Sequence, residues 1–285
     1  MLTALAAALF ALSFAPSIPA AQTPGAVAAP EIKIDALSRV AIIGASVSEG
    51  FQAEQGWQAA FTASIAREFK CVDNGATSLF FMDPNQHGAT QVDAALAAKP
   101  TLVLAVDFLF WYGYGTRDAD GGRIKSEEAR VALLEKGLAL LDKFECPVVV
   151  GDFPDMSVSV GKMLQSKQMP ATETLVKLNA RFAEWAKGKP NVIALPLAQW
   201  MNDLHAHKTL ELAGHKYEPE VTAKWMQDDQ LHPTAAGLAA LAALVDTHLE
   251  AHKLIAKKDY VADVAKVVER MQPKPEKTPA PVGGK

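Results

Sequence analysis

The 285-residue sequence predicts an α/β fold, a three-layer α/β/α sandwich with a five-stranded parallel sheet. Two observations predict it. Short apolar runs rich in β-branched residues alternate with helix-spaced segments along the chain. One of these runs, "TLVLAVDF" (101–108), has almost no polar alternation, which is typical of a strand buried on both faces. Repeated strand–helix alternation favours a parallel sheet with helices on both sides, and we expect one such domain over residues 36–256.

The elements follow in order from their spacing. Strands are expected over 39–44, 70–75, 101–108, 147–153 and 191–197. Apolar side chains at four-residue spacing predict the first long helix over 56–69. Leucines and aromatic residues with the same periodicity predict the later helices, which we expect over 89–99, 134–141, 175–185 and 233–252. We also expect a C-terminal helix over 257–271.

The two ends of the sequence differ from the domain between them. Residues 1–21 form an uncharged apolar segment that ends in proline and small residues, too short and too interrupted for a membrane span. We interpret it as a signal peptide cleaved near Ala20–Ala21, with Ala28 as the alternative, although no basic residue precedes the apolar part. Residues 22–35 are then a linker, and 272–285, rich in Pro and Lys, are a disordered tail. The sequence thus predicts a secreted or periplasmic protein without a stable membrane anchor.

Composition limits the partners of the domain. The formal net charge is −4 and no basic run is present, which excludes typical nucleic-acid binding. The sequence gives no indication of an oligomeric state. Three histidines in "HAHKTLELAGH" (205–215) allow a metal site, but their spacing favours a solvated segment, and we expect no metal or organic cofactor.

The stretch "AIIGASVSEGF" (41–51) places Ser46 where a strand gives way to a helix. A helix start offers free backbone N–H groups and the positive end of a dipole, which suits a nucleophile whose product is an oxyanion. A serine that caps the helix would sit in the same place. This segment alone leaves both interpretations open.

The second informative stretch is "DDQLHPTAAG" (228–237), where Asp229 stands three residues before His232. Pro233 keeps His232 outside the following helix. A carboxylate on the same turn can accept the imidazole Nδ1–H, which leaves Nε2 free to act as a base. The alternative is a pair of capping residues at a surface helix.

These two stretches together resemble the SGNH (GDSL-type) hydrolases. Gly44-Ala45-Ser46-Val47-Ser48 corresponds to the family's Gly-Asp-Ser-x-Ser block, and Asp229-x-x-His232 matches its Asp-x-x-His block. The resemblance implies a flavodoxin-like, SGNH-type sheet of strand order 2-1-3-4-5. It also implies a serine esterase that uses Ser46, Asp229 and His232 as a catalytic triad. With this order, Cys71 and Cys146 are three strand spacings apart, so we expect both to stay unpaired.

Two residues depart from the family pattern. Ala45 replaces an aspartate that we would expect to brace the loop of the nucleophile. Asp107, in Ala105-Val106-Asp107-Phe108, stands where the family has an oxyanion-binding asparagine. An ionised Asp107 cannot donate a hydrogen bond, whereas a protonated one with a strongly raised pKa can. The other interpretation is that Asp107 holds its loop through backbone N–H groups.

The other donors of the oxyanion hole are less clearly marked. We expect the Ser46 N–H together with that of Gly75 or Ser78, in "VDNGATS", and Gly88 is a further candidate. Beyond the third strand, Phe110, Trp111 and Tyr112 are predicted to line a substrate site, with packing as the alternative. Asp152 and Asp155 are either rim residues or loop caps.

The function that the sequence favours is an exported serine esterase, acting on a small-molecule or glycan ester such as a glycan O-acetyl group. An O-acyltransferase would use the same steps. The rival hypothesis is a non-catalytic SGNH-like binding domain, which the residues at positions 45 and 107 motivate.

Overall fold

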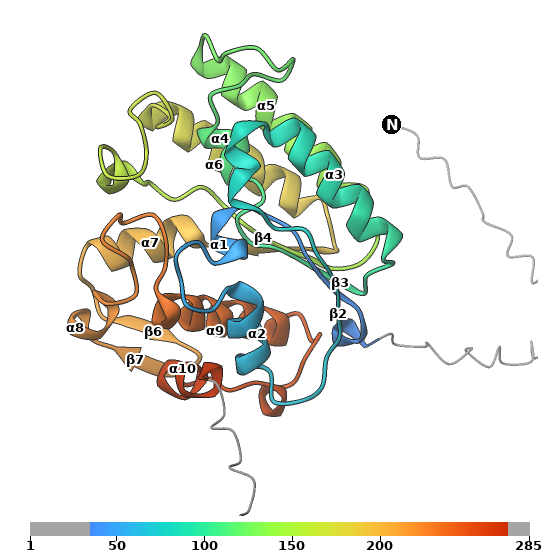
Figure 1. Ribbon diagram of the computed structural model, residues 1–285, viewed down its shortest axis with the longest axis vertical. Helices are drawn as coiled ribbons and strands as arrows, with labels where there is room; N and C mark the ends of the chain where they lie inside the picture. The colour runs from blue at the N-terminus through green and yellow to red at the C-terminus, as the bar shows by residue number, and fades with distance from the viewer. Residues whose placement is uncertain (1–34, 273–285) are drawn as a thin grey trace, which may run out of the picture. The chain divides into compact units, whose positions relative to one another are not determined.

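The computed structural model describes residues 35–272 (Figure 1). The expected signal peptide (1–21), the linker up to residue 34 and the tail from residue 273 lie outside the described residues. Within residues 35–272, no helix is both long and apolar enough to cross a lipid bilayer.

A parallel sheet forms the centre of the structure. Its strands are β1 (Val40–Ile42), β2 (Cys71–Asn74), β3 (Leu102–Ala105), β4 (Val148–Gly151) and β5 (Val192–Leu195). They pair in parallel in the order β2-β1-β3-β4-β5. Every residue of the central strand β3 is buried, as its unbroken apolar run predicts. The predicted fold class and strand order are confirmed.

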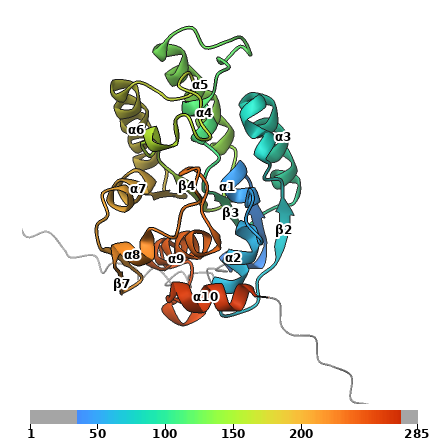
Figure 2. The ribbon, with the colours of Figure 1, turned by 60° about the vertical axis from the view of Figure 1, so that its left-hand side comes forward.

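Helices cover both faces of this sheet (Figures 1 and 2). One layer consists of α2 (Trp57–Ser64), α9 (Ala235–Ala251) and α10 (Val264–Met271), which pack on one another. The other consists of α3 (Pro84–Ala97), α5 (Glu127–Leu141) and α6 (Thr172–Lys187), with α5 between its two neighbours. The buried side chains of both layers belong to one apolar core around the sheet.

Several helix boundaries differ from the sequence-based expectation: α3 begins at Pro84 rather than at residue 89, α5 at Glu127 rather than at 134, and α6 at Thr172 rather than at 175. Helix α2 ends at Ser64 rather than at residue 69, because the Ala66 N–H donates to the Asp259 carbonyl 2.8 Å away instead of continuing the helix. The expected helix over 257–271 is split into a short 3-10 segment, η4 (Lys257–Asp259), and α10. The backbone of residues 65 and 66 is thus used to hold the C-terminal segment against the domain.

Short elements follow the carboxyl ends of the strands. These are α1 (Ser46–Glu49) after β1, η2 (Ser78–Met82) after β2, α4 (Phe110–Tyr114) after β3, η3 (Ser157–Ser159) after β4 and α7 (Leu197–His205) after β5. The remaining elements are η1 (Ala36–Ser38), the hairpin β6 (Leu210–Leu212) and β7 (His215–Tyr217), and α8 (Pro219–Thr222). Because parallel strands end at one common edge, side chains on the first group converge there.

The two cysteines lie on different parts of the sheet. Cys71 begins β2 and Cys146 stands just before β4, with β1 and β3 between these strands. Both thiols are free. Burial raises the pKa of Cys71, and it raises that of Cys146 to about 11, so both side chains stay protonated at neutral pH.

A fully buried carboxyl group lies on α9, at Asp246. Neither of its oxygens has a hydrogen-bond partner within residues 35–272, because the nearby Ser64 hydroxyl donates to the Phe61 carbonyl. Burial raises the pKa of Asp246 to about 8. The folded protein therefore holds a proton here at pH values where the unfolded chain has released it.

We expect this proton to make the protein less stable as the pH rises. A raised pKa contributes stability that is complete below the unfolded pKa, about 3.9, and is lost as the pH rises towards the folded value. The free energy of unfolding should fall by roughly 1 kcal/mol per pH unit between pH 5 and 8. Urea unfolding of Asp246→Asn should show a clearly flatter dependence. The exposed Asp93→Asn should keep the wild-type slope, and an equal slope in all three proteins would contradict the prediction.

Candidate active site

Ser46, His232 and Asp229 form a continuous hydrogen-bonded chain at the carboxyl edge of the sheet. The Ser46 Oγ lies 2.9 Å from Nε2 of His232, and the Nδ1 of the same ring lies 2.7 Å from Oδ2 of Asp229. Ser46 and His232 are buried, and Asp229 is partly exposed. The two stretches singled out in the sequence, 186 residues apart, thus meet here.

The loop that carries His232 is fixed by Asp229 itself. Oδ1 of Asp229 accepts the backbone N–H groups of Leu231 and His232, each at 2.9 Å. Gln230, which lies between Asp229 and Leu231, adopts a left-handed φ of 59°, and this turns the chain back towards Asp229. The Phe51 ring packs against the imidazole of His232, at a centroid distance of 4.6 Å. The orientation of the His232 ring is therefore set by the hydrogen bond from Nδ1 to Asp229 and by the contact with Phe51.

The charge state of Asp229 suits this arrangement. Burial raises the pKa of Asp229, but hydrogen bonds from the His232 side chain and from the backbone N–H groups of His232 and Leu231 outweigh it. The net result is a pKa below its usual value. Asp229 is thus an anion throughout the neutral range, and it can stabilise positive charge on His232.

Gly44 begins the loop that carries Ser46, and here the side chain of Asp107 approaches the backbone very closely. Its φ is 147°, and a Cβ built on it would lie 2.2 Å from Oδ1 of Asp107. The side chain of Gln91, on α3, accepts the Gly44 N–H at 2.7 Å and donates to the Gly44 carbonyl at 3.0 Å. A Cβ at position 44 would also lie 2.6 Å from the Ser48 hydroxyl, so a larger residue would displace Asp107 and Ser48.

Asp107, two residues after the end of β3, supports the same loop through hydrogen bonds. Its Oδ1 accepts the Ala45 N–H at 3.0 Å and the Ser48 hydroxyl at 2.5 Å. Its Oδ2 accepts the N–H groups of Val47 at 2.8 Å and Ser48 at 3.3 Å. The carboxylate therefore holds the residues on both sides of Ser46, while position 45 itself carries only a methyl group.

This geometry corrects the expectation that Asp107 belongs to the oxyanion hole. Burial raises the pKa of Asp107, against the hydrogen bonds from Ser48, Ala45 and Val47 that lower it. Backbone N–H groups can only donate, so both oxygens must act as acceptors whatever the state of the Ser48 hydroxyl. Both oxygens of Asp107 thus contact the loop of residues 45–48, and the side chain braces this loop.

The N–H groups of Gly75 and Ser78, one of which was expected to be the second oxyanion donor, both have acceptors within the protein. The Gly75 N–H donates to the Ile42 carbonyl at 3.0 Å, as part of the pairing between β1 and β2. The Ser78 N–H donates to the Glu49 carboxylate at 2.7 Å. Both groups are thus occupied. The Ser46 N–H, in contrast, has no acceptor within residues 35–272 and remains available for an oxyanion.

The aromatic segment after β3 is mostly a packing element. Tyr112 is fully buried and donates to the Pro84 carbonyl at 2.7 Å. Trp111 is buried between Phe81 and Phe110, at ring distances of 5.7 Å and 5.1 Å. The predicted substrate contacts of Trp111 and Tyr112 are therefore wrong, because both rings are turned into the domain. Phe110 alone of the three lines a pocket beside Ser46.

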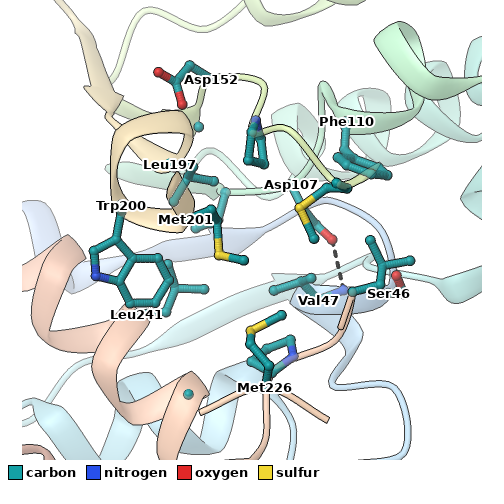
Figure 3. A pocket seen from close by; sticks show the side chains of 17 residues that line it. Ser46, Val47, Asp107, Phe110, Asp152, Leu197, Trp200, Met201, Met226 and Leu241 are labelled. Atoms are coloured by element: carbon teal, nitrogen blue, oxygen red, sulfur yellow. Dashed lines mark hydrogen bonds between the residues drawn. The ribbon is translucent and has the colours of Figure 1, made fainter. Parts of the chain in front are cut away.

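That pocket opens next to Ser46 and encloses about 80 Å³ (Figure 3). Leu197, Trp200 and Met201, all on α7, lie along one side, and Phe110 and Ser46 lie along the opposite side. The rest of the lining is Val47, Val106, Asp107, Gly151, Asp152, Pro154, Met156, Met226, Leu231, Pro233, Gly237 and Leu241. Apolar side chains from four different parts of the chain thus meet beside the serine.

The two aspartates after β4 accept hydrogen bonds from backbone N–H groups. Oδ1 of Asp152 accepts the Ala198 N–H at 2.6 Å, at the start of α7, and Oδ1 of Asp155 accepts the Ser157 N–H at 2.9 Å. Within residues 35–272, no three His, Cys, Asp or Glu side chains lie close enough together to hold a metal ion, and this includes the three histidines of 205–215.

Gln91 is a site residue that the sequence analysis missed. It lies on the buried face of α3 together with Gly88, Val92 and Ala95. An amide side chain in the middle of an apolar helix face needs a buried partner, and here that partner is the backbone of Gly44. This break in the apolar pattern was the signal that would have found it.

Comparisons with known proteins give little beyond this geometry. No family model and no curated protein matches the sequence. A gut microbial diltiazem-metabolizing enzyme is similar in structure, with 12% sequence identity and a TM-score of 0.48, over 74% of this chain and 46% of that one. The protein YxiM from Bacillus subtilis shows 17% identity and a TM-score of 0.43, over 77% and 57%. The chain spans about half the length of these proteins.

Proposed function

We propose that this protein is a serine hydrolase of the SGNH type that cleaves carboxylic esters. The observation that carries the proposal is the unbroken contact from Ser46 Oγ through His232 to Asp229, at 2.9 Å and 2.7 Å. A base within hydrogen-bond reach of a hydroxyl, and itself oriented by a carboxylate, is the arrangement that activates a serine. The Ser46 N–H, without an acceptor in the described chain, adds a donor for the developing oxyanion.

In the proposed reaction the Ser46 Oγ attacks the acyl carbon of the ester while His232 Nε2 takes the hydroxyl proton. Asp229 stabilises the resulting imidazolium without accepting its proton. The tetrahedral intermediate then collapses, His232 returns the proton to the departing alcohol oxygen, and an acyl-serine remains. Water, deprotonated by His232, attacks that acyl group and releases the carboxylic acid and free Ser46.

The rival proposal, a binding domain without activity, is less well supported. A site that only binds has no need for Ser46, His232 and Asp229 at hydrogen-bond distances. A side chain that filled the space beside the serine would favour it, but about 80 Å³ there is empty. Ala45 and Asp107 motivated the rival, and against the first of them stands the support that Asp107 gives to the N–H groups of Ala45 and Val47.

A fluorophosphonate probe tests the proposal directly. We expect it to label the wild-type protein covalently, and we expect labelling to be lost in Ser46→Ala and in His232→Ala. The matched control is Ser38→Ala: its side chain is exposed, its hydroxyl pairs with that of Thr101 and does not contact His232, so labelling of Ser46 should equal that of the wild type. Labelling of all three variants, or of no folded wild-type protein, would contradict an activated Ser46.

We further propose that the protein acts outside the cytoplasm, which rests on the sequence of residues 1–21 alone. The natural substrate would then be an extracellular ester, such as an O-acetyl group on a glycan. N-terminal sequencing of the protein from cell fractions checks this proposal. A mature chain that starts after residue 20 or 28 is expected, and an uncleaved chain in the cytoplasm would contradict it.

A further inference from the structure

The pocket beside Ser46 has a lining that selects what can enter it. Four sulfur-containing or branched apolar side chains, Met156, Met201, Met226 and Leu241, form much of its wall. Its charged groups, Asp107 and Asp152, are already engaged: one holds the nucleophile loop, and the other accepts the Ala198 N–H. A hydroxylated group such as a sugar would lose its hydrogen bonds to water here and find few new ones.

The pocket is also small. Its volume is about 80 Å³, and an apolar cavity of about 150 Å³ takes up benzene with its six carbons, so this space holds about three carbons. That is the length of a short acyl chain beyond its carbonyl. Trp200 and Leu241, on α7 and α9, lie on the side of the pocket away from Phe110 (Figure 3).

We infer that this pocket binds the acyl part of the ester and restricts it to chains of about two to four carbons, with Leu241 as a residue that sets the length. This inference rests on the proposed esterase function. The alcohol part then lies outside the pocket. Each methylene that fits should raise kcat/KM about fourfold, which corresponds to about 0.8 kcal/mol per buried CH2.

The test is the chain-length profile with p-nitrophenyl esters from acetate to octanoate. For the wild-type protein, kcat/KM should be highest at four carbons or fewer and fall at least tenfold by hexanoate. Leu241→Ala opens the pocket, so the ratio of hexanoate to acetate activity should rise about tenfold. Met201→Ala opens it from α7 and should act in the same direction, which keeps the test valid if one variant folds poorly.

The matched control is Leu244→Ala on the same helix. Leu241 and Leu244 are 4% and 7% exposed, so the two truncations remove equal side chains at similar burial, but Leu244 does not line the pocket. Its profile should equal that of the wild type. Hydrolysis with an unchanged profile in Leu241→Ala and Met201→Ala, or with an optimum at octanoate, would overturn the inference and leave the esterase function intact. A protein that hydrolyses none of these esters and takes no fluorophosphonate label would remove both.

Discussion

Asp229→Asn is expected to lower kcat by about 10⁴-fold while the protein stays folded. The asparagine oxygen can still accept the backbone N–H groups of Leu231 and His232, so the loop keeps its shape. Its amide group, however, would face Nδ1 of His232 as a donor. The ring would then carry its proton on Nε2, and it could not accept the proton of Ser46.

The measurement is kcat and KM on a p-nitrophenyl ester, together with the melting temperature. Asp228→Asn is the matched control, because Asp228 is the preceding residue in the sequence, is exposed and makes no hydrogen bond in the described chain. We expect its kinetics to be unchanged. A kcat for Asp229→Asn within tenfold of the wild type would mean that Asp229 only caps the loop, the alternative open from the sequence.

Asp107→Asn is expected to lower kcat by about 10²-fold with little change in KM. The carboxylate accepts four hydrogen bonds, three of them from backbone N–H groups on both sides of Ser46. An amide would turn donors of its own towards some of these groups, so the loop would shift. A displacement of about 1 Å at a nucleophile is enough for a loss of this size.

This expectation is opposite to the one that the family resemblance alone suggests. In SGNH hydrolases an asparagine at this position donates to the oxyanion, so Asp107→Asn would be expected to raise activity. Higher kcat in the variant would therefore disprove the brace. Ser48→Ala, which removes one of the four donors, should lower kcat in the same direction but less. The half-buried helix cap Asp83→Asn should leave kcat and stability nearly unchanged, because asparagine caps a helix about as well as aspartate.

Most of the fold could be predicted from the sequence because its signals are local. Four of the five strands are apolar runs, β2 with its Asp73 and Asn74 being the exception, and the alternation with helices favours a parallel sheet. The end of α2 could not be predicted, since the apolar spacing continues through Phe69 while the backbone of Ala66 bonds to Asp259, far along the chain. A tertiary hydrogen bond of this kind leaves no trace in the spacing of residues.

In the candidate site, too, the local features could be predicted and the tertiary contacts could not. Ser46, Asp229 and His232 belong to two short motifs, and the spacing within each motif indicates how its residues are placed. Predictions of backbone donors went wrong at Gly75 and Ser78, because sequence does not tell whether an N–H group already has an acceptor. The prediction that Trp111 and Tyr112 contact the substrate was wrong because both rings are buried. The sequence pattern is the same whether an aromatic residue after a strand packs into the domain or faces the solvent.

The hydrogen bonds between Asp107 and the loop around Ser46 connect the opening of this loop to the opening of the central sheet. Loops at active sites are usually among the first parts of a protein to open. Here the Ala45 and Val47 amides are held by a residue that directly continues the central strand, and Gln91 holds Gly44 from the neighbouring helix. The amide hydrogens of Ala45 and Val47 should therefore exchange with solvent as slowly as those of β3, whereas that of Ser46, which has no acceptor within residues 35–272, should exchange faster.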